Sequence, residues 1–383
     1  MSPDTLNRPA GAPDADRQVS LFLCGDVMTG RGIDQILPHP SAPNLHESYV
    51  RNASIYVKLA EAAYGEIRRP VEPAYPWGEA LHALDQASPD VRIINLETSV
   101  TTSGSYWRAK GIHYRMHPRN IECLTVAGTD VAVLANNHVL DFGYSGLTET
   151  LETLEKAGIG TAGAGRNLEQ AQQPARVEIG NGHAVLVFGL GAESSGIAPD
   201  WAALEDRVGV DYLDDLSDRT AAAVSDRIRA AKAPGDLVVA SIHWGSNWGY
   251  EIPRAQIHFA HRLIDSGVDI VHGHSSHHPR AIEIYRSKLI LYGCGDFIND
   301  YEGISGYETF RDDLRLMYFA QLWTTNGALR ELRMVPMMSR RLRLAHASRH
   351  DAEWLQATLS RASENFGTRF RLLEDDSLRI EWD

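Results

Sequence analysis

The segment LANNHVLDFG, residues 134–143, decides the fold because it shows how a buried strand ends. Apolar residues lead into two amides and an imidazole, Asn136, Asn137 and His138, and a carboxylate follows at Asp141. The segment contains no lysine or arginine that could pair with Asp141 or with these polar side chains. Ligands of open α/β sheets bind beyond the carboxyl ends of the strands, so polar side chains at this position predict one wall of a binding site.

The rest of the chain repeats this arrangement of apolar runs that end in polar residues. The runs span residues 19–26, 91–97, 183–190, 237–245, 268–277 and 288–297. They are apolar on both faces, which is typical of strands that lie between other layers. Helical periodicity in residues 144–158, 215–236 and 254–267 makes this a mainly α/β domain. Residues 316–338, which surround a Thr-Thr-Asn-Gly turn, predict a β-hairpin.

We expect one main domain with additions along the 383-residue chain. The main domain covers residues 18–340, after a disordered tail at 1–17 and before a C-terminal appendage at 341–383. A long insertion, residues 34–90, follows the first strand and is rich in proline, tyrosine and tryptophan. It either packs over the sheet as a cap or shapes a substrate cleft.

Composition excludes several classes of protein. The chain is 43% apolar and 23% charged, as soluble globular proteins are. Its net charge of −13 argues against nucleic acid and anionic membranes as partners. The three cysteines are far apart, which indicates a reducing compartment. The sequence shows neither a signal peptide nor a membrane-spanning run, so we expect a cytoplasmic protein.

The polar strand ends together predict a metal site with acid–base groups. Carboxylate, amide and imidazole are ligands of divalent cations, and an ion would supply the charge that these ends lack. The expected metal ligands are Asp26, Glu97, Asn137, His243, His272, His274 and His277. The expected catalytic groups are His138, His243 and His274 with Asp26, Asp141 and Asp296. His258 and His261 lie in a helical run and are expected to be structural, whereas His277 and His278 belong either to the site or to a loop.

Six motifs carry a resemblance to a known family. They are GDVMTGR (25–31), NLET (95–98), ANNHVLDFG (135–143), HWG (243–245), GHSSH (273–277) and YGCGDF (292–297). In this order they resemble the CapA family, named for a poly-γ-glutamate capsule synthesis protein and a branch of the calcineurin-like metallophosphoesterases. The resemblance implies an α/β/β/α sandwich with its site at the strand ends.

The sequence also departs from the wider superfamily in ways that the CapA branch shares. Metallophosphoesterases generally begin with an Asp-x-His motif, but here Val27 and Met28 follow Asp26. The bridging-aspartate motif is replaced by Asn95-Leu96-Glu97. Two ions about 3.5–4 Å apart clamp the reacting oxygens in phosphoester hydrolysis. We therefore expect one divalent ion rather than two, with Ca, Mn, Mg and Zn all open.

Three functions remain open, and the first is preferred. CapA-like enzymes resemble the epimerases of lasso-peptide precursors, which implies a metal-dependent isomerase that inverts Cα of a C-terminal residue of a ribosomal peptide. This chemistry needs two acid–base groups and a cationic centre. The alternatives are a metal-dependent hydrolase, phosphoesterase or poly-γ-glutamate biosynthesis protein, and a binding module for an anionic polymer.

The preferred function assigns side chains to the peptide substrate. Arginine and lysine bind carboxylates well, and tryptophan forms rigid contact surfaces. Arg31, Lys110 and Arg115 are expected to hold a terminal carboxylate. Trp107, Trp244 and Trp248 either line a peptide-binding wall or belong to the core.

Overall fold

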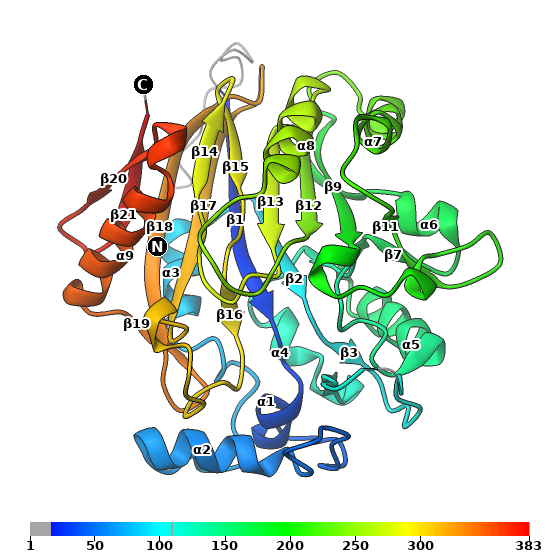
Figure 1. The fold of residues 1–383 in the computed structure, drawn as a ribbon, viewed down its shortest axis with the longest axis vertical. Helices are drawn as coiled ribbons and strands as arrows, with labels where there is room; N and C mark the ends of the chain where they lie inside the picture. The colour runs from blue at the N-terminus through cyan, green and yellow to red at the C-terminus, as the bar shows by residue number, and fades with distance from the viewer. Residues whose placement is uncertain (1–16, 109, 383) are drawn as a thin grey trace, which may run out of the picture.

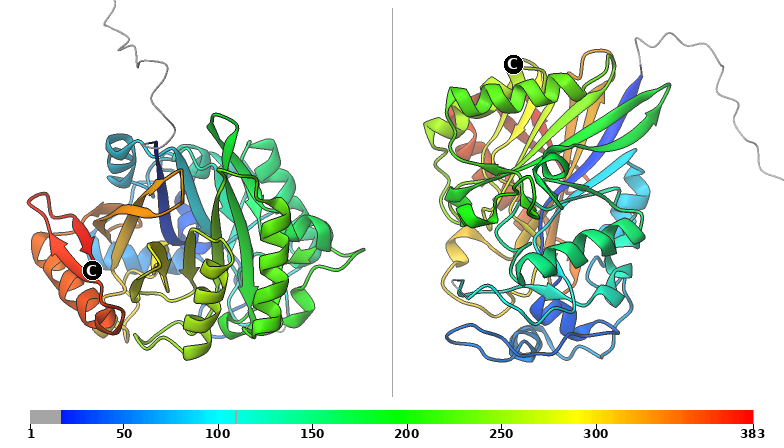
Figure 2. Two further views of the ribbon diagram at one scale, coloured as in Figure 1. Left: turned by 90° about the horizontal axis from the view of Figure 1, so that it is seen from above. Right: turned by 90° about the vertical axis from the view of Figure 1, so that its right-hand side faces the viewer.

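Two β-sheets packed face to face, with helices on both outer sides, form the protein (Figure 1, Figure 2). The computed structural model describes residues 17–108 and 110–382. The predicted α/β/β/α sandwich is therefore confirmed. Apart from Arg17, the tail predicted at 1–17 lies outside the described residues. Within the described ranges, no helix combines the length and the hydropathy needed to cross a membrane.

The first sheet has ten strands, and β1 (Gln18–Val27) lies near its centre. This strand runs parallel to β2 (Val91–Leu96) and β16 (Asp296–Ile298), and antiparallel to β17 (Leu314–Trp323). The remaining strands are β5 (Val131–Val133), β6 (Gly160–Ala162), β18 (Leu329–Ser339), β19 (Leu344–His346), β20 (Arg369–Leu372) and β21 (Leu378–Glu381). The pairing of β17 with β18 confirms the predicted hairpin.

The second sheet has seven strands, and its centre is parallel. In it β9 (His183–Ala192), β12 (Leu237–His243), β13 (Ile270–His274) and β15 (Lys288–Leu291) run side by side. The outer strands are β8 (Ala175–Gly180), β11 (Tyr212–Leu213) and β14 (Ile282–Tyr285). Two small sheets pair β3 (Ser99–Val100) with β4 (Arg115–Met116), and β7 (Ala164–Gly165) with β10 (Gly209–Val210).

Three apolar cores hold the layers together. One fills the space between the sheets, where Leu21 and Ile93 meet Val187 and Val239. A second joins the first sheet to α1 (Arg31–Ile36), α2 (Ser54–Tyr64), α3 (Ala80–Ala87), α4 (Glu122–Thr125) and α5 (Gly143–Lys156). A third joins the second sheet to α7 (Asp218–Ala231) and α8 (Arg254–Asp265). The two remaining helices are α6 (Leu168–Gln172) and α9 (Arg349–Ala362).

The predicted insertion and appendage both join the main body. Residues 34–90 contribute the second half of α1 and all of α2 and α3, and in Figure 1 α1 and α2 lie beyond the carboxyl end of β1. The C-terminal residues 341–383 contribute β19, α9, β20 and β21, and β21 pairs with β18. The C-terminal segment thus extends the first sheet, while the boundary at residue 340 stays a prediction.

Strand register brings the polar strand ends together. Asp26 of β1 lies opposite both Asn95 and Asp296, and His243 of β12 lies opposite His274 of β13. Gly25 allows this approach, because a Cβ atom there would stand 1.6 Å from the carbonyl oxygen of Gly295. Both sheets therefore end in one shared polar region.

Candidate active site

Asp26 lies at the centre of the polar region and is wholly buried. Its Oδ1 accepts a hydrogen bond from Nδ2 of Asn95 at 2.7 Å. Asn136 donates in turn to Asn95 Oδ1 at 3.0 Å, so a relay of two amides fixes the carboxylate. Asp26 Oδ2 and the Oε2 atom of the buried Glu97 have no hydrogen-bond partner. Burial and the nearby Asp296 raise the pKa of Asp26 to about 7, and burial also raises the pKa of Glu97.

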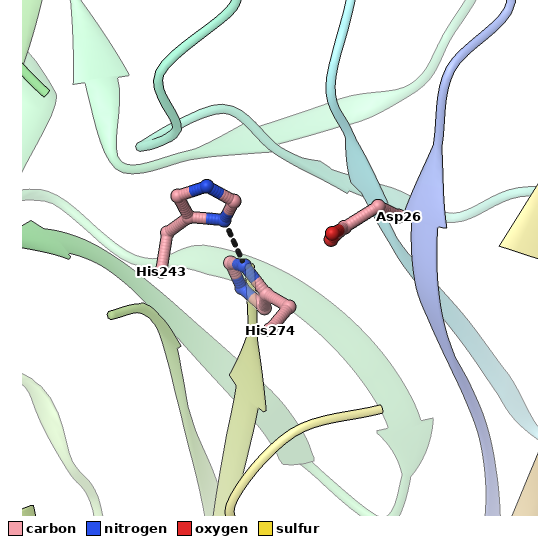
Figure 3. A group of neighbouring side chains, drawn as sticks. All are labelled: Asp26, His243 and His274. Carbon is pink, nitrogen blue, oxygen red and sulfur yellow. Dashed lines mark hydrogen bonds between the residues drawn. The ribbon is translucent and has the colours of Figure 1, made fainter. Parts of the chain in front are cut away.

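A histidine pair from the second sheet faces Asp26 (Figure 3). His243 Nδ1 and His274 Nδ1 are 2.7 Å apart, and burial lowers the pKa of both rings. The other nitrogen of His243 lies 3.2 Å from Asn137 Oδ1 and 3.8 Å from Glu97 Oε1. The chain turns sharply after the pair, since Ser275 has a φ of +101°. Non-glycine residues in this conformation are costly and concentrate at functional sites.

A second histidine, His277, forms a dyad with Asp296. Its Nδ1 lies 2.8 Å from Asp296 Oδ1, and its Nε2 lies 2.9 Å from Nδ2 of the Asn247 side chain. Burial favours a neutral ring, but the Asp296 carboxylate outweighs it and raises the pKa of His277. Burial likewise opposes ionisation of Asp296, yet His277 holds the pKa of that carboxyl below its usual value. The two groups form an ion pair.

A third histidine, His138, forms a dyad with Asp141. Its Nδ1 lies 2.6 Å from Asp141 Oδ2, and Nζ of Lys110 donates to Asp141 Oδ1 at 2.6 Å. Burial, together with the positive charge of Lys110, lowers the pKa of His138 to about 4, so the ring is neutral at pH 7. Its Nε2 lies 3.7 Å from Glu97 Oε1. This dyad comes from the loop after β5 of the first sheet, whereas His277 follows β13 of the second.

Both dyads open into one cavity of about 330 Å³. Glu97, Lys110, His138 and His277 supply its polar wall, and Tyr114 and Tyr301 supply aromatic surface. The two tyrosines are tied together by a hydrogen bond of 2.9 Å between their hydroxyl groups. The cavity can therefore bring a substrate atom close to two acid–base groups from different sheets.

The residues around this cavity include two groups that could hold a metal ion. Asp26 combines with His243 and His274, and separately with His277 and Asp296, in groups whose ligand atoms lie within 4.8 Å of one another. With all four ionised, the carboxyl groups of Asp26, Glu97, Asp141 and Asp296 would exceed the cations Lys110 and His277 by two charges, and the raised pKa values of Asp26 and Glu97 oppose that state while no cation is bound. Buried charge requires compensation. A bound metal cation would offset this excess and could also be contacted by the two carboxylate oxygens that lack hydrogen-bond partners.

Two predicted site residues belong to the framework instead. His272 Nε2 donates to the carbonyl of Cys24 at 2.8 Å and its Nδ1 lies 3.0 Å from Ser241 Oγ, and His272 belongs to neither group of described residues whose ligand atoms lie close enough to hold an ion. Trp244 is 1% exposed in the core beneath α8, and its Nε1 donates to the carbonyl of Tyr292. The expectations that His272 is a metal ligand and that Trp244 lines a substrate wall are therefore corrected.

The predicted carboxylate-binding cations already have partners. Arg31 binds Asp300 at 2.5 Å and Glu47 at 2.9 Å. Arg115 donates to the backbone carbonyls of residues 103 and 42, and Lys110 pairs with Asp141. Each of the three cations thus already has an acceptor within the protein, and their role in holding a substrate carboxylate stays a prediction.

Of the other predicted residues, one lines a cavity and the rest pack against neighbouring side chains. Trp248 lines an adjoining cavity, whereas Trp107 packs edge-on against Trp201 and Tyr144. His258 and His261 lie on α8, where His261 contacts Glu283 at 2.9 Å. His278 accepts a hydrogen bond from the backbone of Gly249 and stacks on Phe310.

Sequence reasoning missed several residues that shape the site. The amide of Asn95 stands two positions before Glu97, and its place at a strand end was a usable signal. Ser241, which lies 2.9 Å from His274 Nε2, looks in the sequence like one more small residue within a strand. Tyr301 stands beyond the last recognised motif, and no pattern marked it.

Comparison with known proteins assigns the family. Residues 20–301 match the family described as "Bacterial capsule synthesis protein PGA_cap". This chain belongs to that family. The resemblance to CapA proteins is thereby confirmed over most of the chain.

Named relatives cover the chain to different extents. A "probable polyglutamine synthesis accessory protein" of Mycobacterium tuberculosis H37Rv is 50% identical over 97% of both chains. The "capsule biosynthesis protein CapA" of Bacillus anthracis is 24% identical over 79% of this chain and 64% of its own. The "PGA biosynthesis protein CapA" of Bacillus subtilis is 26% identical over 79% and 68%, respectively. A solved structure from Thermus thermophilus, with 11% identity, a TM-score of 0.34 and coverage of 67% and 93%, is too distant to carry an argument.

Proposed function

We propose that this member of the capsule synthesis family is a metal-assisted acid–base enzyme that inverts Cα of a residue in a peptide chain. One observation carries the proposal. Two histidine–carboxylate dyads, His138–Asp141 and His277–Asp296, reach the same cavity from different sheets. Inversion at carbon requires a base on one face and an acid on the other.

We assign proton removal to His138. We place the ring proton on Nδ1, which lies 2.6 Å from Asp141 Oδ2 and 2.9 Å from Nζ of Lys110, so that the Nε2 lone pair is left for a substrate. The backbone amide of Tyr114 donates to the same Asp141 oxygen at 2.7 Å, which holds the dyad in position. When the Cα–H bond breaks, the proton goes to Nε2 and the electron pair moves onto the adjacent carbonyl oxygen.

We assign proton delivery to His277. Its pairing with Asp296 through Nδ1 favours the protonated ring, and the proton delivered would be the one on Nε2, toward which Asn247 would turn its side-chain oxygen in place of Nδ2. Delivery to the opposite face of the carbon completes the inversion and returns the electron pair from oxygen to carbon. His138 then holds an additional proton and His277 lacks one, and exchange with water restores both.

The metal ligands would lie between the two dyads. Asp26, His243 and His274 would hold the ion, with Glu97 and Asn137 beside them. A divalent ion bound there would supply the positive charge that a developing oxyanion needs. The relay from Asn136 through Asn95 would keep Asp26 oriented toward it.

The relatives' names favour a substrate built from glutamine or glutamate. The mycobacterial relative is named for polyglutamine synthesis and the Bacillus relatives for capsule or PGA biosynthesis. We therefore propose chains of these residues first. The C-terminal residue of a ribosomal peptide precursor, such as a lasso peptide, is the second form of peptide that the same chemistry would accept.

The test is incubation of the Mn²⁺-loaded protein with short glutamine and glutamate peptides in D₂O. Peptide mass and residue chirality are measured after hydrolysis. The proposal predicts about one added mass unit for each inverted residue, and loss of both signals in His138→Gln. The matched control is His261→Gln, which changes a histidine of α8 that contacts Glu283. Inversion without deuterium, or equal activity in His138→Gln, would reject the proposal.

Hydrolysis or transfer of a peptide or phosphoester bond is the second candidate. The Asp26–His243–His274 group favours it, because a metal bound there could also activate water. In the same incubations this activity would release new amino groups or phosphate and leave the chirality of every residue unchanged.

A further inference from the structure

A second, aromatic cavity of about 180 Å³ adjoins the acid–base cavity. The two share a wall made by Ile112, Tyr114, Asn247, His277 and Tyr301. Beyond this wall the second cavity is lined by residues of the insertion and of the loop before β17, including Tyr49, Tyr56, Ile304 and Tyr307. We refer to it as the outer cavity.

The outer cavity gathers apolar side chains that stand exposed to solvent. Seven large hydrophobic residues are exposed within the described parts of the chain, and three of them, Tyr49, Ile304 and Tyr307, line this cavity. Trp248 stacks on Tyr307 with ring centres 4.1 Å apart. Exposed apolar surface concentrated at one place marks a binding site.

Both cationic side chains that line the outer cavity already pair with carboxylates. Arg31 is bound by Asp300 and Glu47, and His277 is bound by Asp296. Asp312 adds a carboxylate to the lining. Among the described groups at or next to this cavity three positive charges therefore face four negative charges: Arg31, His277 and Arg315 against Glu47, Asp296, Asp300 and Asp312.

This balance selects against an anionic occupant. A carboxylate entering the outer cavity would leave water without gaining a free cation, and it would meet a net negative surface. An uncharged side chain would bury apolar area against Trp248, Ile304 and Ile112 without that penalty. A primary amide also fits, because the side chains of Asn247 and the tyrosines can exchange hydrogen bonds with it.

We infer that the outer cavity binds an uncharged residue of the peptide, so that the enzyme selects chains with glutamine or an apolar residue, rather than glutamate, beside the reacting residue. The position of this residue beside a reacting one rests on the proposed function. The binding preference itself does not depend on turnover.

The test measures binding of two synthetic peptides of equal length, oligoglutamine and oligo-γ-glutamate, by calorimetry. The protein is Mn²⁺-loaded His138→Gln, which holds the site without turning over. We expect oligoglutamine to bind at least about tenfold more tightly, and the difference to shrink at high salt as charge repulsion is screened. Equal or tighter binding of oligo-γ-glutamate would overturn the inference.

A matched pair of variants tests whether the outer cavity causes the preference for oligoglutamine. Tyr307→Ala in the outer cavity should weaken oligoglutamine binding about tenfold. Tyr64→Ala on α2 removes a tyrosine of the same 41% exposure outside both cavities and should leave binding unchanged. Asp312→Asn should tighten oligo-γ-glutamate binding and so reduce the difference between the two affinities. Unchanged oligoglutamine binding in Tyr307→Ala would contradict the inference.

The two proposals can fail separately. Selective binding of oligoglutamine without deuterium incorporation would reject the epimerase and retain the outer cavity as a selective site. Deuterium incorporation into γ-glutamate chains as fast as into glutamine chains would retain the epimerase and reject the selectivity.

Discussion

Replacing Asp26 with asparagine should stabilise the metal-free protein. Burial and Asp296 raise the pKa of Asp26 from 3.8 to about 7. A carboxyl group whose pKa is higher in the folded state favours folding while it is protonated, so this shift reduces stability as pH rises from about 4 to 7. At 1.36 kcal/mol per pKa unit, the ionised form costs up to about 4 kcal/mol above pH 7.

Asparagine removes this cost and keeps the shape of the side chain. Its oxygen can still accept the hydrogen bond from Asn95, and its amide can donate toward the free oxygen of Glu97. The variant should also lose stabilisation by metal. An ion present at 100 times its dissociation constant stabilises the wild-type protein by about 2.7 kcal/mol, whereas Asp26→Asn should gain little.

Urea denaturation at pH 8, in EDTA and in MnCl₂, measures both effects. The control is Asp34→Asn, because Asp34 is also buried but accepts hydrogen bonds from the backbones of Ser41 and His117 and from Asn120. Burial raises the pKa of Asp34 as well, but this control breaks accepted hydrogen bonds worth about 1–3 kcal/mol, so it should gain less stability than Asp26→Asn in EDTA and should respond to Mn²⁺ as the wild type does. A decrease in stability of Asp26→Asn in EDTA, or an unchanged response to Mn²⁺, would refute the reasoning.

Three further predictions concern the histidines and the close approach of β1. Asp141→Asn should lower the rate of deuterium incorporation at least 100-fold, because the amide no longer fixes the His138 tautomer; an unchanged rate would exclude His138 as the base. Burial lowers the pKa of His272 from 6.5 to about 4, so the neutral ring stabilises the fold fully above pH 6.5 and about 3 kcal/mol of folding free energy is lost as pH falls to 4. His272→Gln should flatten the dependence of stability on pH in this range. An unaltered dependence would show that other groups cause the loss of stability in acid. Gly25→Ala should abolish folded expression, since the added Cβ would overlap the carbonyl of Gly295; a folded, metal-binding variant would show that β1 can move away.

The layers of the fold and most strand ends were predictable from the sequence because buried strands carry their own signal. Runs apolar on both faces locate β1, β9 and β12, and the polar residues that end them mark the edge where ligands bind. The hairpin of β17 and β18 was equally visible from its turn.

Partners distant in sequence were not predictable. Arg31 appeared free to hold a substrate because its carboxylate partner Asp300 lies 269 residues away. Lys110 similarly pairs with Asp141, which lies 31 residues further along the chain. Charge balance inside a site depends on these long-range pairs, and no local pattern records them.

Two strand-end residues were misassigned because neighbours in sequence can face different layers. His243 points into the site, whereas Trp244 next to it enters the core beneath α8. His272 and His274 lie two positions apart on β13, but only His274 joins a group able to hold a metal. Polar residues at a strand end indicate that a site lies there, but they do not show which side chains enter it.

The most direct test of the two-dyad chemistry is the early distribution of deuterium between recovered substrate and inverted product. The Mn²⁺-loaded protein is given unlabelled oligoglutamine in D₂O and stopped before about a tenth is converted. Removal by His138 and delivery by His277 predict deuterium in nearly every inverted residue and almost none in the recovered substrate. Deuterium appearing equally in both would show that one group removes and returns the proton, and would contradict the assignment of two dyads to opposite faces.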